Sequence, residues 1–188
     1  MTMTLNVLIV VIIFSIISFA QSDKQITKIK ENYYALKELQ PDLEKKSIIE
    51  MGYSTGGAEF TFFINDFNQV LIVEAEFLGE IGKSNHEYYY KNDSLFFLLI
   101  IDEYYNSPVS SLSMTDEELK EDGMEMLDYS KSSVSENRYY FAKGQLIKWL
   151  DNNNKSVQDT TREFKKLSKD HFGFSKELLS KYQHKEND

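Results

Sequence analysis

The sequence predicts a single α+β domain in which an antiparallel β-meander of about six strands carries an N-terminal helix and C-terminal helices packed on one face. Three observations lead to this prediction. Apolar residues recur with helical spacing before the sheet region, aromatic strand-like segments alternate with polar turns in the middle, and helical spacing returns near the end.

The first 20 residues have the composition of a signal peptide. Met1 to Ala20 contains no charged side chain, and its centre from Leu5 to Ile17 is almost entirely apolar. Small residues at Ser18 and Ala20 fit the pattern that signal peptidase requires, so cleavage is expected after Ala20. An uncleaved anchor is the alternative, because the stretch nearly reaches the roughly 20 residues of a membrane span. The mature protein is expected to be periplasmic or secreted and free of the membrane.

Residues 21–188 have the length of one domain, interrupted by an acidic and partly irregular insertion at residues 106–133. The sequence contains no Cys, which excludes zinc–thiolate sites and Cys nucleophiles. Its formal net charge is −9, from 30 acidic and 21 basic side chains. This balance argues against nucleic acid and anionic membranes as partners, because both are usually recognised by basic patches.

From Asp23 to about Ile49 the pattern is helical. Its apolar residues recur at steps of three and four, at Ile26, Ile29, Tyr33, Leu36 and Leu39. Pro41 interrupts this pattern, because the residue before a proline is disfavoured in the α conformation. The helix therefore either ends near Leu39 or restarts with Pro41 in its first turn.

The sheet is expected to begin after Gly56-Gly57. Strands are predicted at Ala58 to Ile64 and at Val70 to Leu78, and the second alternates in a way that leaves one face partly wet. Leu95 to Ile101 is apolar at every position. Such a segment is typical of an interior strand that is covered on both faces.

One hairpin sequence occurs twice. Glu87 to Leu98 aligns without a gap with Arg138 to Trp149, so that Tyr-Tyr-aromatic matches Tyr-Tyr-aromatic and Lys143-Gly144 falls on Asn92-Asp93. The pattern predicts two strands joined by a tight turn that accepts positive φ. Phe60 to Leu71 is a looser relative with a longer turn, and three hairpins make about six strands.

The acidic insertion and the C-terminal region are expected to contain helices. Thr115 and Glu118 fit a capping box for a short helix that ends at Gly123, and a partly disordered excursion is the alternative. After the last strand a helix is expected from Val157 to about Leu167. A break at His171 to Phe174 would then separate it from a final helix.

The repeated unit, Tyr-Tyr-aromatic-x-(Asn/Lys)-(Asp/Gly)-x-Leu, resembles the hairpins of MORN-like repeat proteins. With its flanking helices, the chain also resembles small exported proteins of unknown function from Bacteroidetes-type bacteria. The resemblance covers Phe60 to Leu71, Glu87 to Leu98 and Arg138 to Trp149. The unequal spacing of these units and the acidic insertion between two of them depart from a MORN array. The resemblance implies a Tyr-rich meander and no assigned activity, so it provides no catalytic residue.

The titratable residues suggest one catalytic hypothesis. His86, His171 and His184 lack metal-like spacing, so no metal ligand and no cofactor is predicted. Glu74 and Glu76 fall on one face of a strand, about 7 Å apart at ~3.4 Å per residue. Paired carboxylates at such a distance can hydrolyse glycosides. Alternating Glu residues are, however, more typical of a solvated strand face.

The aromatic residues suggest a binding surface. Tyr and Trp combine apolar area with a polar group, and exposed faces rich in them stack on sugars or contact proteins. Cross-strand packing inside the sheet is the alternative. The candidates for ligand or partner binding are Tyr88, Tyr90, Tyr104, Tyr105, Tyr139 and Trp149.

The leading hypothesis is therefore an exported, non-enzymatic protein that binds a protein or glycan partner through an open aromatic face of the sheet. One alternative is a hydrolase that acts on a glycan with Glu74 and Glu76. The other is a structural or inhibitory protein without a small-molecule site.

Overall fold

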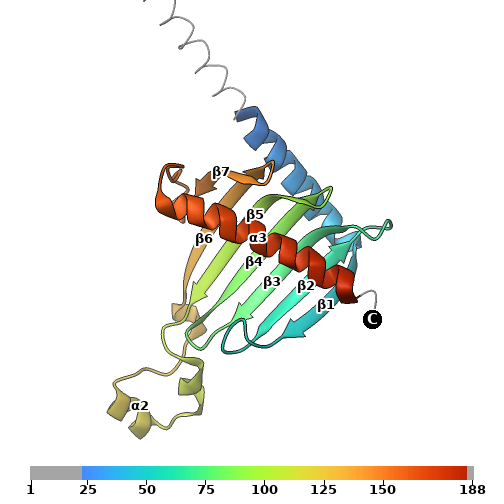
Figure 1. Cartoon of the computed structure of the whole chain (residues 1–188). Helices are drawn as coiled ribbons and strands as arrows, with labels where there is room; N and C mark the ends of the chain where they lie inside the picture. The colour runs from blue at the N-terminus through green and yellow to red at the C-terminus, as the bar shows by residue number, and fades with distance from the viewer. Residues whose placement is uncertain (1–22, 186–188) are drawn as a thin grey trace, which may run out of the picture.

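The computed structural model describes residues 23–185 and places one antiparallel sheet between two helices (Figure 1). The sheet has seven strands, each paired with its neighbours in the chain. The strands are β1 (Glu44–Glu50), β2 (Ala58–Ile64), β3 (Val70–Leu78), β4 (Gly82–Lys91), β5 (Ser94–Tyr104), β6 (Ser133–Ala142) and β7 (Gln145–Leu150). The predicted α+β class and meander are confirmed, with one strand more than expected.

The additional strand is β1. The N-terminal helix, described over residues 23–39, ends before Pro41 in the 3₁₀ turn η1 (Gln40–Asp42), so the first of the two predicted alternatives is correct. The chain then pairs with β2 from Glu44 opposite Ile64 to Glu50 opposite Ala58. The expectation of helical structure up to Ile49 is wrong here. An edge strand buries few side chains, so its apolar pattern is short. Such a short pattern is compatible both with the two-residue period of a strand and with the 3.6-residue period of a helix.

The two repeated hairpins have the predicted turns. Asn92 and Asp93 join β4 to β5 with φ of 51° and 55°, and Lys143 and Gly144 join β6 to β7 with φ of 53° and 75°. Two successive residues with positive φ form a type I′ turn, whose twist matches that of the flanking strands. The aligned sequences therefore fold into the same connection.

Three hairpins of the sheet also share a β-bulge close to the turn. The register shifts lie between Phe63 and Ile64, between Tyr89 and Tyr90, and between Tyr140 and Phe141. On each partner strand the shift leaves one residue that faces no residue of the bulged strand. These three residues are Leu71, Phe96 and Ile147. All three pack in or against the hydrophobic cluster below the N-terminal helix. Because a bulge increases local twist, the same device curves the sheet at each hairpin.

The two long helices cover opposite faces of the sheet, which corrects the prediction that they pack on one face. Helix α3 (Arg162–Lys185) buries Leu178 and Tyr182 in the cluster on one face, here called the α3 face. The N-terminal helix buries Ile26 and Ile29 in the cluster on the other face, called the N-helix face. The strands carry large apolar side chains on both sides, so each face requires its own cover.

Helix α3 is one continuous helix of 24 residues, without the expected break at His171 to Phe174. Gly173 in a helix costs only about 1 kcal/mol relative to Ala. Phe172 and Phe174 on either side of it pack against the core, and this burial outweighs the cost. Within residues 23–185 no helix is long and apolar enough to cross a membrane. The predicted signal peptide lies outside the described residues.

The acidic insertion forms an arm that projects from the end of the sheet (Figure 1), here defined as residues 105–132. It contains the 3₁₀ turns η2 (Val109–Ser113) and η3 (Tyr129–Lys131) and the short helix α2 (Asp116–Asp122). The predicted capping box is confirmed. The Thr115 hydroxyl accepts from the Glu118 N–H at 3.3 Å, and the Glu118 carboxylate accepts from the Thr115 N–H at 2.7 Å.

Candidate functional site

Four of the six predicted aromatic binding residues lie in the core beneath α3. Tyr88, Tyr90, Tyr139 and Trp149 are between 1% and 8% exposed. The Tyr90 hydroxyl donates to the carbonyl of Ser175 on α3 at 3.0 Å, and Tyr139 stacks on Trp149 with ring centroids 5.5 Å apart. The expected open aromatic face is therefore absent from this part of the sheet, because α3 covers it. These four residues stabilise the fold.

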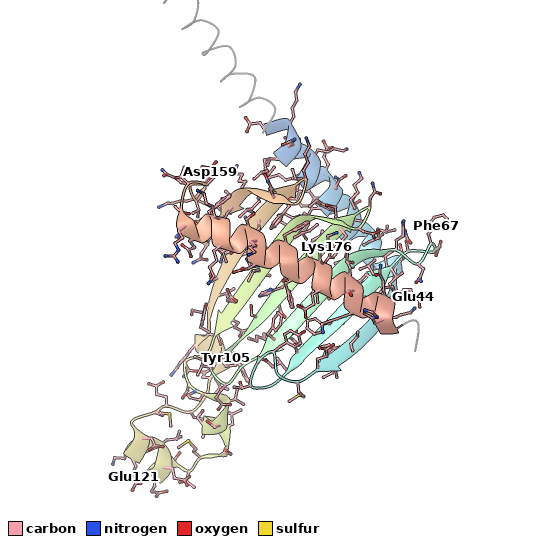
Figure 2. All side chains as sticks on the ribbon, viewed as in Figure 1. Glu44, Phe67, Tyr105, Glu121, Asp159 and Lys176 are labelled. Atoms are coloured by element: carbon pink, nitrogen blue, oxygen red, sulfur yellow. The ribbon has the colours of Figure 1, made fainter. Side chains whose placement is uncertain are left out.

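Of the other two candidates, Tyr104 is the last residue of β5. Tyr105 follows it at the base of the arm (Figure 2). Tyr104 is exposed, and Tyr105 packs edge-to-face against Tyr129 of the arm with ring centroids 5.3 Å apart. Burial raises the pKa of the Tyr105 phenol. The structure thus separates these two residues from the four that it gathers under α3.

A chain of hydrogen bonds on the α3 face was not singled out by the sequence. The Tyr88 hydroxyl lies 3.1 Å from Nδ1 of His86, Nε2 of His86 lies 2.8 Å from Oγ of Ser84, and this Oγ lies 2.5 Å from Oδ1 of Asp102. An ionised carboxylate only accepts, so Ser84 donates to Asp102, Nε2 donates to Ser84, and Nδ1 accepts from Tyr88. The sequence shows that Ser84, His86 and Tyr88 alternate along one strand. That Asp102 lies opposite Ser84 depends on the register between β4 and β5, which the sequence does not reveal.

The order of this chain differs from that of a Ser-His-Asp triad. In a triad the Ser hydroxyl donates to His, whereas here it donates to the carboxylate and His86 is itself the donor. His86 is enclosed by the ring of Phe77, with centroids 4.9 Å apart, and burial lowers its pKa to about 3. The neutral imidazole therefore links a buried tyrosine to a polar strand end, which is a structural role.

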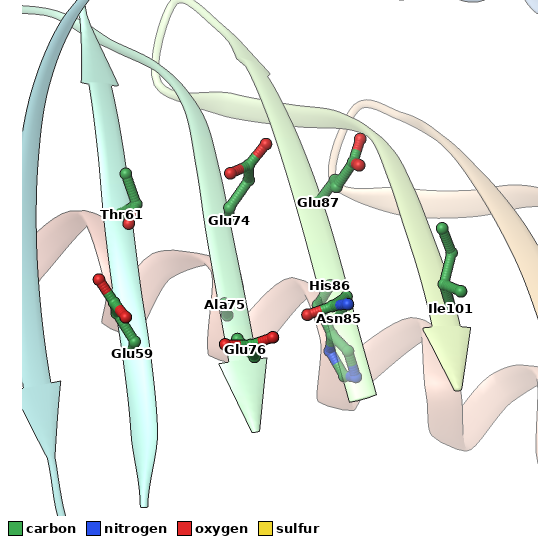
Figure 3. A pocket seen from close by; sticks show the side chains of 9 residues that line it. All are labelled: Glu59, Thr61, Glu74, Ala75, Glu76, Asn85, His86, Glu87 and Ile101. Atoms are coloured by element: carbon green, nitrogen blue, oxygen red, sulfur yellow. The ribbon is translucent and has the colours of Figure 1, made fainter. Parts of the chain in front are cut away.

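The N-terminal helix covers only part of its face and leaves a shallow hollow of about 380 Å³ beside its C-terminal end. Glu74 and Glu76 both line it, as the strand alternation predicted. Figure 3 shows four carboxylates on three neighbouring strands, all on the side of the sheet away from α3. They belong to Glu59, Glu74, Glu76 and Glu87, and the lining also includes Thr61, Ala75, Asn85, His86 and Ile101. We call this site the acidic hollow.

Two of these carboxylates hold the end of the N-terminal helix. Glu87 lies 3.1 Å from Nζ of Lys37, and Glu74 accepts from Nε2 of Gln40 at 2.6 Å. Glu59 and Glu76 have no hydrogen bond or ion pair within the described part of the chain. The C-terminal end of a helix also carries partial negative charge. The hollow therefore favours a cationic group.

The carboxylate pair of the hydrolase hypothesis lacks the arrangement of a glycosidase. Glycosidase carboxylates flank the scissile bond from two sides, whereas Glu74 and Glu76 stand side by side on one strand. The Glu74 carboxylate is turned away from Glu76 in Figure 3 and is occupied by Gln40. In residues 23–185 no three His, Asp or Glu side chains gather so that they could hold a metal ion.

Exposed apolar residues surround the acidic hollow. Ile49 is 73% exposed and Val134 is 61% exposed, and the register places both on the N-helix face, outside the rows that the helix covers. We call this uncovered surface the open half. It comprises Ile49, Glu59, Glu76, Leu78, Lys83, Asn85, Ile101, Glu103 and Val134, and Lys83 forms an ion pair with Glu103 at 3.5 Å. Its combination of carboxylates and apolar side chains is typical of a protein-binding surface.

Comparisons of this chain with protein-family models, with curated proteins and with solved structures found no match. A functional proposal therefore depends on the surfaces that the fold exposes.

Proposed function

We propose that this is an exported, non-enzymatic binding protein that holds a cationic, amphipathic segment of a partner protein on its open half. The observation that carries the proposal is the partial cover of the N-helix face. The described helix buries one half of this face and leaves Glu59 and Glu76 unpaired beside exposed Ile49. Carboxylates surrounded by exposed apolar side chains favour a partner with Lys or Arg beside apolar side chains.

The N-terminal helix provides a precedent for this mode of binding on the same face. It is Lys-rich and amphipathic, it buries Ile26 and Ile29 against the sheet, and its Lys37 pairs with Glu87. A partner segment of similar chemistry would place apolar side chains near Ile101 and cationic ones near Glu76. The net charge of −9 would further attract such a segment over distance, with an on-rate that falls as salt rises.

The two other functions receive less support. Glycan hydrolysis by Glu74 and Glu76 would require carboxylates on two sides of a bond. A purely structural role gives no account of the exposed Ile49 and Val134 beside these carboxylates, since burying apolar side chains would stabilise the fold more. Binding through Tyr88 or Trp149 would require α3 to leave the sheet. The open half needs no such rearrangement.

The test is a binding titration with a defined probe. A fluorescein-labelled amphipathic peptide of Lys and Leu should raise its anisotropy with the wild-type protein, and a peptide with Glu at each Lys position should not. The double variant Glu59→Gln, Glu76→Gln should weaken binding by roughly 2- to 30-fold, because two exposed ion pairs contribute ~0.2–1 kcal/mol each.

A matched control separates site binding from general charge attraction. Glu117→Gln with Glu121→Gln removes the same charge from exposed positions of α2. Equal weakening by both double variants would contradict the proposed location, and failure of the wild-type protein to bind the Lys peptide would contradict the proposed partner.

A further inference from the structure

A second hollow lies on the other side of the N-terminal helix, where this helix crosses β5, β6 and the end of β7. Its volume is about 320 Å³, at the lower end of the roughly 300–1,000 Å³ range of small-molecule sites. It is lined by an aromatic group from the helix and β5 and by a polar group from β6 and the turn after β7. The residues that matter are Tyr33, Tyr34, Phe97, Glu136, Arg138 and Asn154.

The aromatic wall is rigid on its inner side and open on its outer side. The Tyr33 ring packs against the Phe97 ring with centroids 4.8 Å apart, and Phe97 is buried. Tyr34 packs edge-on against Tyr33 at 5.1 Å and is 63% exposed, so most of its ring faces solvent. An exposed aromatic ring that packs against a half-buried neighbour, itself held by the core, offers a stacking surface at low entropic cost.

The polar wall opposite is a preorganised set of donors and acceptors. The Arg138 guanidinium forms an ion pair with Glu136 and donates a hydrogen bond to the amide oxygen of Asn154. Glu136 therefore compensates the charge of Arg138. The wall still offers guanidinium and amide N–H donors and carboxylate and amide oxygen acceptors.

This combination selects the class of ligand. An anion would have to displace Glu136 from Arg138, and a cation would face the positive charge of Lys30 at the same hollow. A neutral ligand with an apolar face and many hydroxyl groups satisfies both walls. Its apolar face can lie on Tyr34, and its hydroxyls can donate to Glu136 and accept from Arg138.

We infer that this hollow is a binding site for a neutral saccharide, with one sugar ring stacked on Tyr34 and its hydroxyls bonded to Glu136, Arg138 and Asn154. The site is separate from the open half and does not depend on the function proposed for that surface. It also uses tyrosines outside the repeated hairpins, which the sequence did not single out as ligand-binding.

Saturation-transfer difference NMR with four purified probes tests the inference: maltotriose, cellotriose, laminaritriose and chitotriose. At least one probe should receive saturation from the wild-type protein. Tyr34→Ala should weaken the binding of that probe by roughly 2- to 10-fold, the range expected for loss of an aromatic contact. Asn154→Gly should also weaken it, and Gly is chosen because Asn154 has a φ of 58°.

Tyr129→Ala is the matched control, since Tyr129 is an exposed tyrosine of the arm that does not line this hollow. It should leave saccharide binding unchanged. Tyr34 is a surface residue, so its variant should keep the wild-type circular dichroism spectrum and melting temperature. Absence of saturation transfer to all four probes would overturn the inference. So would binding that survives both Tyr34→Ala and Asn154→Gly.

Discussion

Lys37 of the N-terminal helix and Glu87 of β4 form an ion pair, with 3.1 Å between Nζ and the nearer carboxylate oxygen. The Glu87 side chain is only 16% exposed, which distinguishes the pair from the exposed Lys28–Glu31 pair on the outer side of the helix. The Lys37–Glu87 contact fixes where the helix ends on the sheet. It therefore sets the boundary of the open half.

Loss of the Lys37 charge should destabilise the protein. Lys37→Met leaves a largely buried carboxylate without its cation, which costs about 1–3 kcal/mol. Lys28→Met removes an exposed partner and should change the free energy of unfolding by less than about 0.5 kcal/mol. Urea denaturation of both variants measures the difference. Equal effects would show that the Lys37–Glu87 pair does not hold the helix end.

Stability should fall as the pH drops below about 6.5, partly because of two histidines between the sheet and α3, namely His86 on β4 and His171 on α3. Burial lowers the pKa of His86 to about 3 and that of His171 to about 4, from an ordinary value of 6.5. The unfolded chain therefore binds protons at a pH where the folded protein does not. The stabilisation is complete above about pH 6.5 and is lost as the pH falls towards 4. Each His adds a slope of up to ~1.4 kcal/mol per pH unit in that window.

His171→Phe isolates this effect, because the carboxylates contribute equally in the variant and in the wild-type protein. His171 packs against Tyr139 with ring centroids 4.8 Å apart, and its nearest charged influence is Asp170. The free energy of unfolding of the variant should fall less steeply between pH 6.5 and pH 4 than that of the wild-type protein. His184→Gln, at an exposed position, should follow the wild-type curve. Parallel curves for His171→Phe and wild type would contradict the assignment.

Two glycines should respond to Ala in opposite directions. A Cβ on Gly82 would lie 2.3 Å from the carbonyl oxygen of Glu103, so Gly82→Ala must push β4 away from β5 and should destabilise by more than about 2 kcal/mol. A Cβ on Gly173 meets nothing within 4 Å, and this residue lies inside α3. Gly173→Ala should therefore stabilise by about 0.5–1 kcal/mol. Thermal unfolding measures both, and a loss of stability in Gly173→Ala would contradict the continuous helix.

The fold could largely be predicted because its signals are local. The turn at Lys143-Gly144 requires positive φ, and the apolar run of Leu95 to Ile101 requires cover on both faces. Strand β1 could not be predicted, because its two apolar residues, Ile48 and Ile49, are too few to distinguish a strand from a helix. The prediction also places both helices on one face, although Tyr88 and Tyr89 point to opposite faces and both need burial.

The candidate sites were harder to predict because they depend on register. Tyr88 could bind a partner only if no helix covered it. Helix α3, which is distant from Tyr88 in the sequence, covers it in the structure. Glu74 and Glu76 were paired correctly along one strand. Their neighbours Glu59 and Glu87 come from adjacent strands. The β2–β3 bulge and the β3–β4 loop that set those alignments leave no clear pattern in a single sequence.

The most direct test of the proposed function is to map where the Lys and Leu peptide binds on the isotope-labelled protein. The arm is the strongest competitor, because its residues 105–132 contain seven acidic and two basic side chains. Titration followed by ¹H–¹⁵N correlation spectra should shift the backbone amides of Glu59, Glu76 and Asn85 in the open half. Shifts confined to the arm would contradict the account.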